Sequence, residues 1–206
     1  MRVRQHVNPL KSDFFTIAPA PVQVPAGAPL EVELGSAEAW FLMDRARQDP
    51  GGFYLGVEIR RELVQKAQEE CARAGLPQVH NVFANMSVDL PRLLPPGRVG
   101  RFFLNFPDPW WKSAQHKRRV LCPALIEHLA ALLAVGGELY VNTDIFAHGL
   151  DAMFLLESDG GQRFENLRGP WSFLPENPFA ARSRRELQCE RDGVKVWRLG
   201  YRRRAR

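Results

Sequence analysis

Between residues 30 and 157 the chain alternates between short apolar runs and longer segments that carry apolar residues at helical spacing. The short runs predict buried β-strands. They cover residues 30–35, 53–58, 79–84, 101–106 and 138–144. The longer segments predict helices, which cover residues 37–49, 61–74, 120–135 and 147–157. With two later strands expected at 163–167 and 194–201, the pattern predicts an α/β fold built on an open, mostly parallel sheet.

The clearest helix spans residues 61–74. Its apolar residues recur on one face, at Leu63, Val64, Ala67 and Cys71, and Gly75 suits the position after the last turn. Residues 170–182 are rich in Pro, Asn and Trp and are expected to form a loop. No internal repeat interrupts this order, so the core is expected to be a single one.

Polar side chains follow several of the predicted strands. In an open parallel sheet, ligands bind outside the carboxyl ends of the strands, near the point where the strand order reverses. The candidate positions are Glu33 to Gly35, Glu58, Asn85, Asn105 to Asp108, and Asp144. Polar residues that end apolar strands are typical of a site placed on a core.

Two of these positions suggest a nucleoside. Glu58 ends the second strand, 23 residues after Gly35, where nucleotide-binding folds place an acid on the ribose hydroxyls. The amide of Asn85 suits an adenine edge. The turn after the first strand, Gly35-Ser36-Ala37-Glu38-Ala39, keeps only its first glycine and is weak evidence for a nucleotide. No P-loop is present, which argues against ATP or GTP.

The length of 206 residues predicts one domain, residues 30–206, with a basic C-terminal tail. Residues 1–29 contain five prolines and are expected to form a basic arm over the core. No apolar stretch reaches the length of a membrane span, and no signal-peptide core follows the basic first residues. Three separated cysteines and five scattered histidines predict neither a disulfide framework nor a metal site, and they favour a reducing cytoplasm.

The positive charge is concentrated in separate clusters. Residues 182–206 hold ten Lys and Arg against three acids, or +7, so the rest of the net +5 chain carries −2. A second cluster spans residues 112–119, and Arg2, Arg4 and Lys11 form a smaller one. Clusters of this kind are often solvated surface. Folded onto one face, they form the electrostatic footprint of a nucleic-acid binder.

The stretch 101–119 combines a buried strand, a proline-locked loop and a basic run. Asp108 lies between Pro107 and Pro109, which restrict its backbone. Trp110 and Trp111 follow. A Pro-Asp-Pro turn is ordinary by itself. The two indoles and the cations beyond them favour a functional loop, with the indoles either stacked on a base or packed in the protein.

These residues resemble the bacterial tRNA (guanine-N7-)-methyltransferases over about residues 2–201. The matching motifs are Arg4-Gln5-His6-Val7-Asn8-Pro9-Leu10, Leu104-Asn105-Phe106-Pro107-Asp108-Pro109-Trp110, Lys112, His116-Lys117-Arg118-Arg119, Asn142-Thr143-Asp144, and Ser183-Arg184-Arg185-Glu186 ahead of Gly193. The resemblance implies a Rossmann-like class I methyltransferase fold with a seven-stranded, mostly parallel sheet and helices on both faces. It implies S-adenosylmethionine as donor and N7 of a guanine in the tRNA variable loop as acceptor, for a monomer or a homodimer.

The resemblance also implies roles for individual residues. The donor-binding positions are Glu33, Gly35, Glu58, Asn85 and Asp108. Asp108 is in addition the implied catalytic acid. The implied tRNA-binding positions are Lys112, His116, Lys117, Arg118, Arg119, Asp144, Ser183 and Glu186. No metal is implied.

The chain departs from the family pattern at three places. The family's Gly-x-Gly-x-Gly is here residues 35–39 with alanine at the second and third glycine, Asn85 replaces an Asp, and Ser183 replaces a Thr. The added methyl groups predict crowding of the methionine part of the donor. The leading alternative is therefore a tRNA-binding relative with an impaired donor site. The basic clusters argue against a small-molecule methyltransferase, and the poor glycine fingerprint argues against a nicotinamide oxidoreductase.

Overall fold

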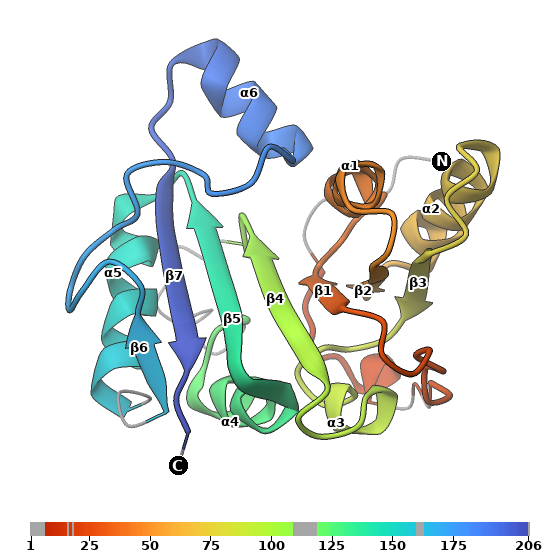
Figure 1. Cartoon of the computed structure of the whole chain (residues 1–206), viewed down its shortest axis with the longest axis horizontal. Helices are drawn as coiled ribbons and strands as arrows, with labels where there is room; N and C mark the ends of the chain where they lie inside the picture. Colours follow the sequence, from red (N-terminus) through yellow and green to blue (C-terminus); the bar gives the residue numbers. More distant parts are fainter. Residues whose placement is uncertain (1–6, 16, 18, 109–118, 160–162, 206) are drawn as a thin grey trace.

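A computed structural model describes residues 7–15, 17, 19–108, 119–159 and 163–205. Their centre is a seven-stranded sheet with the order β3-β2-β1-β4-β5-β7-β6 (Figure 1). The strands are β1 Leu30–Leu34, β2 Phe53–Glu58, β3 Val79–Phe83, β4 Val99–Asn105, β5 Leu133–Thr143, β6 Phe164–Asn166 and β7 Trp197–Arg203. β1 to β5 pair in parallel, and β7 runs antiparallel to both β5 and β6. The predicted open, mostly parallel sheet is confirmed.

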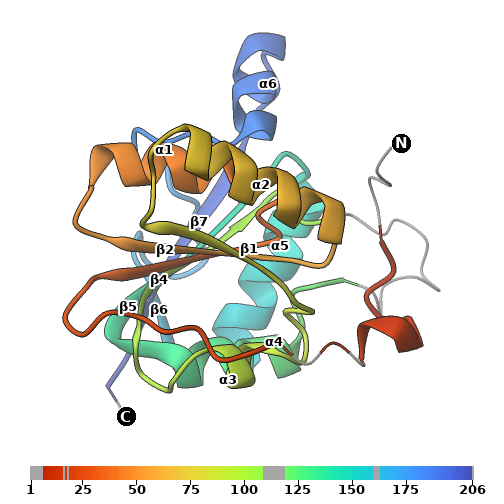
Figure 2. The ribbon, with the colours of Figure 1, turned by 90° about the vertical axis from the view of Figure 1, so that its right-hand side faces the viewer.

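Helices cover both faces of the sheet. They are α1 Trp40–Gln48, α2 Arg61–Arg73, α3 Leu90–Leu93, α4 Pro123–Leu132, α5 Phe146–Phe154 and α6 Arg184–Asp192. Figure 2 shows α1 and α2 on one face and α3 and α4 on the other. Short 3₁₀ and π turns lie at Ser12–Phe14 and Leu155–Asp159. None of the helices in the described part of the chain has the length and apolar character of a membrane span.

The alternation of side chains along each strand divides the core between the two faces. Phe102 and Leu104 of β4 join an aliphatic cluster, whereas Phe103 joins an aromatic one. In the aromatic cluster Phe103 makes an edge contact with Phe41 of α1 and stacks on Tyr140 of β5. This packing fixes β4, and with it the loop that follows.

The strand order reverses between β1 and β4. The chain forms β1, β2 and β3 in one direction from the centre, and then returns to lay β4 on the other side of β1. Because adjacent parallel strands all end at the same edge, the carboxyl ends of β1 and β4 flank this switch point. The geometry of such sheets places a ligand crevice there.

Several predicted boundaries are wrong. Helix α4 ends at Leu132, and residues 133–135 already belong to β5. The expected helical stop at Gly136-Gly137 is instead a bend in the strand, because a Cβ at Gly137 would lie 3.0 Å from the Val99 carbonyl oxygen. Helix α1 starts at Trp40, later than expected, since residues 36–39 form a turn. The last strand spans Trp197–Arg203, later than the predicted 194–201.

The described part of the N-terminal arm lies against the core. The Val22 N–H donates to the Leu93 carbonyl at 2.9 Å, and Arg98 donates to the Ala28 carbonyl at 2.7 Å. These bonds attach the arm to α3 and to the residue before β4. Residues 1–6, which include the cations Arg2 and Arg4, lie outside the described residues.

Candidate functional site

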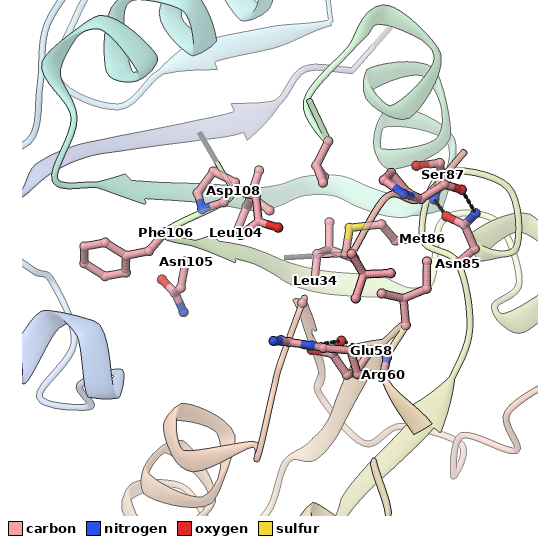
Figure 3. A pocket seen from close by; sticks show the side chains of 16 residues that line it. Leu34, Glu58, Arg60, Asn85, Met86, Ser87, Leu104, Asn105, Phe106 and Asp108 are labelled. Carbon is pink, nitrogen blue, oxygen red and sulfur yellow. Dashed lines mark hydrogen bonds and ion pairs between the residues drawn. The ribbon is translucent and has the colours of Figure 1, made fainter. Parts of the chain in front are cut away.

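Two adjoining cavities open at the carboxyl ends of the central strands. The first contains Gly35, Glu58, Asn85 and Asp108 in its lining and has a volume of about 120 Å³ (Figure 3). The second contains Glu33, Ser183 and Asp144 and has a volume of about 580 Å³. Ligand cavities typically measure about 300–1,000 Å³, so the second cavity has the size of a small-molecule site. Both cavities therefore open at the edge of the sheet where the sequence predicts a ligand.

Asp108 stands at the junction, because it lines both cavities. The chain reaches it through Phe106, whose φ of 50° is in the left-handed region that bulky residues rarely adopt. The Phe106 N–H donates to the Asn142 carbonyl of β5 at 2.7 Å, which holds the turn. In Figure 3, Asp108 lies on the β4 side of the cavity, across from Glu58. Pro109, Trp110 and Trp111 lie outside the described residues.

The carboxylate of Glu58 is buried and fully engaged. It accepts four N–H groups, from the Ala37 amide at 2.9 Å and from the Arg60 backbone and guanidinium at 2.8–3.0 Å. A carboxylate offers about four acceptor positions, so all of them are in use. Glu58 lies where a ribose is expected, but ribose hydroxyls bind its carboxylate only when the guanidinium of Arg60 gives way. Sequence analysis did not identify Arg60, although its position two residues after Glu58 was the available signal.

Asn85 also lines the first cavity, with both ends of its amide bonded. Its Oδ1 accepts the Ser87 N–H at 3.1 Å, and its Nδ2 donates to the Pro9 carbonyl at 3.0 Å. The N-terminal arm thus closes the cavity on the side of Asn85. Contact with an adenine edge through this amide remains a prediction, and it requires Pro9 to move.

The turn after β1 has the backbone of a glycine turn in spite of its alanines. Gly35, Ala37 and Ala39 all have positive φ, at 77°, 48° and 57°. These are the three positions where the family pattern has glycine. The left-handed conformation costs a non-glycine residue roughly 1–2 kcal/mol. The turn therefore keeps the backbone shape of a glycine turn, at the cost of backbone strain.

Glu33 is buried and lines the second cavity. Its Oε1 accepts the Asn105 side chain at 2.8 Å, whereas its Oε2 accepts no hydrogen bond from any described residue. Burial raises the pKa of its carboxyl to about 8, with a further increase from the nearby Glu58 charge, and the Asn105 bond opposes both. Once ionised, a buried carboxyl with an unbonded oxygen favours a cationic partner.

The outer wall of the second cavity comes from the start of α6. Its Ser183 Oγ accepts the Glu186 N–H at 3.2 Å and caps the helix. Arg185 pairs with Asp144 after β5, and Arg184 pairs with Glu38 and lies over the Trp40 ring. These contacts hold α6 against the body of the protein, from which its far end extends (Figure 1). The sequence motif contained both arginines, but their partners were not predictable from it.

Glu186 has a different environment from the other expected tRNA-binding residues. It is buried and does not line either of the two cavities. Its Oε1 accepts Arg198 at 2.7 Å and Asn177 at 3.0 Å. In this structure its carboxylate joins α6 to β7. A direct contact with tRNA stays a prediction.

The basic run is only partly described. Lys112, His116, Lys117 and Arg118 lie outside the described residues. Arg119 is described and pairs with Asp151 of α5 at 2.6 Å. Within the described residues, no group of three His, Cys, Asp or Glu side chains is arranged to hold a metal ion.

Comparison with known proteins places this geometry in context. Residues 27–199 match a family model described as "Putative methyltransferase". A tRNA (guanine-N(7)-)-methyltransferase of Synechococcus sp. strain JA-3-3Ab is 37% identical over 98% of this chain and 86% of its own length. One from Thermosynechococcus vestitus is 34% identical over 98% of this chain and 95% of its own length.

Solved structures give the same fold at lower identity. A SAM-dependent methyltransferase from Aquifex aeolicus aligns over 86% of this chain and 82% of its own, with a TM-score of 0.57 and 12% identity. An aminoglycoside resistance methyltransferase aligns over 85% of this chain and 87% of its own, with a TM-score of 0.55 and 17% identity. At these identities the likeness shows the fold, which confirms the predicted class I methyltransferase architecture.

Proposed function

The chain belongs to the tRNA (guanine-N7-)-methyltransferase family, and we propose that it transfers a methyl group from S-adenosylmethionine to N7 of a guanine in the tRNA variable loop. The observation that carries this proposal is the position of Asp108. It lines both the cavity that contains Gly35, Glu58 and Asn85 and the cavity that contains Glu33, Asp144 and Ser183. One carboxylate therefore faces the expected nucleoside of the donor and the expected guanine.

The residues at the site fit the donor. S-adenosylmethionine supplies an electrophilic methyl group on a sulfonium, and it carries an ammonium at the end of its methionine part. The open Oε2 of Glu33 suits that ammonium, and Glu58 lies where the ribose belongs. The turn at residues 35–39 keeps a glycine-like backbone, which supports donor binding over the alternative of an impaired site.

Methyl transfer to guanine requires that N7 and the methyl group are positioned for attack and that the positive charge on the ring is stabilised. Guanine N7 has a lone pair and no proton, so its attack on a methyl group needs no general base. The ring becomes positive as the methyl transfers, and a fixed carboxylate stabilises that charge. We assign this role to Asp108, through the N1–H and the exocyclic amine of guanine, with Asp144 as support. Asp144 must first exchange its pairing with Arg185.

The tRNA backbone is bound by cations in this proposal. Lys112, His116, Lys117, Arg118, Arg119 and the C-terminal arginines hold phosphates, which gives affinity with little sequence information. The target base must leave its stacked position to enter the cavity. The reduced thiols of Cys71, Cys122 and Cys189 agree with action in the cytoplasm. A monomer or a homodimer remains an expectation.

The deciding experiment incubates the chain with unmodified tRNA and methyl-labelled S-adenosylmethionine, followed by nucleoside analysis. Label in 7-methylguanosine is expected. A matched tRNA with 7-deazaguanosine at the target position lacks N7 and must stay unlabelled. Binding of tRNA together with calorimetric absence of donor binding would overturn the proposal in favour of the impaired relative.

A further inference from the structure

Three side chains at the ends of neighbouring strands form a chain of hydrogen bonds that ends at the second cavity. Asn142 of β5 donates from Nδ2 to Asn105 Oδ1 at 2.8 Å. Asn105 of β4 donates from Nδ2 to Glu33 Oε1 of β1 at 2.8 Å. Asn105 and Asn142 are also register partners in the sheet. The acid at the end of this chain has its other oxygen, Oε2, buried and without a partner among the described residues.

We propose that Asn105 and Asn142 are positioning residues, which orient Glu33 so that its open oxygen receives the ammonium group of S-adenosylmethionine. This inference rests on the proposed function, because it assumes that the methionine part of the donor enters the second cavity. Neither asparagine was assigned a role by sequence analysis beyond its place at a strand end.

The direction of the hydrogen bonds carries the argument. A carboxamide has one accepting oxygen and one donating nitrogen. Because Asn142 donates to the oxygen of Asn105, the nitrogen of Asn105 is the end that faces Glu33. An N–H donated to a carboxyl favours its ionised form, and the Asn105 bond does lower the pKa that burial raises. The two amides thus prepare a buried acid to carry a negative charge.

Among the groups of the donor, the ammonium is the one that suits the unbonded Oε2 of Glu33. An ionised carboxylate in a buried site is costly unless a cation pairs with it. The ammonium offers three N–H donors, whereas a sulfonium offers none. The other charged groups that line the cavity are Glu38, Arg60, Asp108, Asp144, Arg184 and Arg185. Ion pairs join Arg60 to Glu58, Arg184 to Glu38 and Arg185 to Asp144, whereas Glu33 has no cationic partner among the described residues.

Two substitutions of Asn142 test the direction of the hydrogen bonds from Asn142 through Asn105 to Glu33. Asn142→Asp is nearly isosteric, but its carboxylate only accepts, so it attracts the nitrogen of Asn105 and turns the amide oxygen toward Glu33. Asn142→Leu removes the donor without reversing the amide. We expect calorimetry to show S-adenosylmethionine bound about 10-fold more weakly by Asn142→Asp, and less weakened by Asn142→Leu.

A donor fragment separates this role from general damage. 5′-Methylthioadenosine keeps the adenosine but lacks the ammonium, so both variants must bind it within about 2-fold of the unchanged chain. Equal weakening of both ligands would mean a collapsed site and would overturn the proposal. Unchanged S-adenosylmethionine affinity in both variants would do the same.

The pH profile provides a second readout. Affinity for S-adenosylmethionine is expected to rise with pH as Glu33 ionises near its pKa of about 8, and to fall again as the ammonium of the donor loses its own proton, at roughly pH 8 for an α-amino group. Asn105→Leu removes a bond that favours ionisation, so its midpoint must move to higher pH. An unchanged midpoint of the pH profile would contradict the proposed role of Asn105 and Asn142 in orienting Glu33. Failure of the proposed function is distinguished from this, because then the unchanged chain itself leaves no label in 7-methylguanosine.

Discussion

In the proposed mechanism a single carboxylate, that of Asp108, stabilises the positive charge that develops on guanine. We expect Asp108→Asn, which keeps the size of the side chain, to lower kcat by at least about 10²-fold, as is typical when one preorganised electrostatic partner is removed. Single-turnover assays with labelled donor measure this. Binding of tRNA should change little, because phosphate contacts supply most of that affinity.

Asp192→Asn is the matched control, because Asp192 is an exposed residue at the end of α6 that lines neither cavity. It should retain full activity. If Asp108→Asn loses tRNA binding in proportion to its activity, Asp108 is a scaffold residue and the assignment fails.

The strained turn after β1 makes a prediction about stability. Ala37 has a φ of 48°, which an alanine adopts at a cost of roughly 1–2 kcal/mol and a glycine adopts at almost none. Ala37→Gly should therefore raise the free energy of unfolding by about 1 kcal/mol, less the added chain entropy of glycine. Urea denaturation measures the change.

The matched control for that change is Ala72→Gly, in an exposed position of α2 with ordinary helical geometry. There glycine should cost about 1 kcal/mol. Opposite signs at the two positions identify backbone strain as the cause. A loss of stability at both would show that the methyl group of Ala37 is needed for packing.

Among the elements, α6 depends on a buried acid. Glu186 is 1% exposed and bonds Arg198 of β7 at 2.7 Å. Removing one partner of a buried pair leaves an uncompensated charge and typically costs about 3–5 kcal/mol. Glu186→Ala should therefore destabilise the protein by roughly 3 kcal/mol in urea denaturation.

Glu190→Ala gives the comparison on the same helix. Glu190 pairs with Arg182 at 2.9 Å near the surface, so its loss should cost less than about 1 kcal/mol. If Glu186→Ala keeps the stability of the unchanged chain but loses tRNA affinity, the implied substrate role is the correct one.

The same element shows where sequence patterns fail. The five central strands were predictable because each is a short apolar run between turns. Helix α6 was not, because Arg184–Asp192 is rich in charge and its position depends on contacts with Glu38 and Asp144, more than 40 residues earlier. Asp108 and Glu58 were predicted as polar strand ends, and both line the first cavity. The hydrogen bonds from Asn142 through Asn105 to Glu33 were not predictable, since a sequence pattern does not show which end of an amide side chain faces its neighbour.

For the molecule as a whole, the number of Lys and Arg residues overstates the positive charge that is available to bind phosphates. Of the nine Lys and Arg that the structure describes in residues 182–205, five pair with acids. They are Arg182, Arg184, Arg185, Arg198 and Arg202. Arg185 and Arg184 hold α6 in place, so phosphates must compete with Asp144 and Glu38 for them. The salt dependence of tRNA binding should consequently be smaller than the +7 of this region suggests.

The stability of the whole fold should depend on pH through Glu33. Its pKa is raised from 4.5 to about 8 in the folded state, so folding favours the protonated carboxyl. The stabilising contribution of this proton is fully present below about pH 4.5 and is lost as the pH rises through 8, at up to about 1.4 kcal/mol per pH unit. Glu33→Gln cannot lose a proton and should lack this fall. Relative to the unchanged chain, it should gain on the order of a few kcal/mol between pH 5 and pH 8 in urea denaturation.

Glu62→Gln, at an exposed position of α2, controls for the loss of one acid and should run parallel to the unchanged chain. Saturating S-adenosylmethionine should reduce the difference in stability between Glu33→Gln and the unchanged chain at pH 8. The ammonium of the ligand compensates the ionised carboxylate of Glu33, whereas in the glutamine variant it finds no negative charge at this position. Parallel stability curves for Glu33→Gln and the unchanged chain would mean that Glu33 titrates normally. The buried acid would then already be ionised at neutral pH, and donor affinity would show no rise near pH 8.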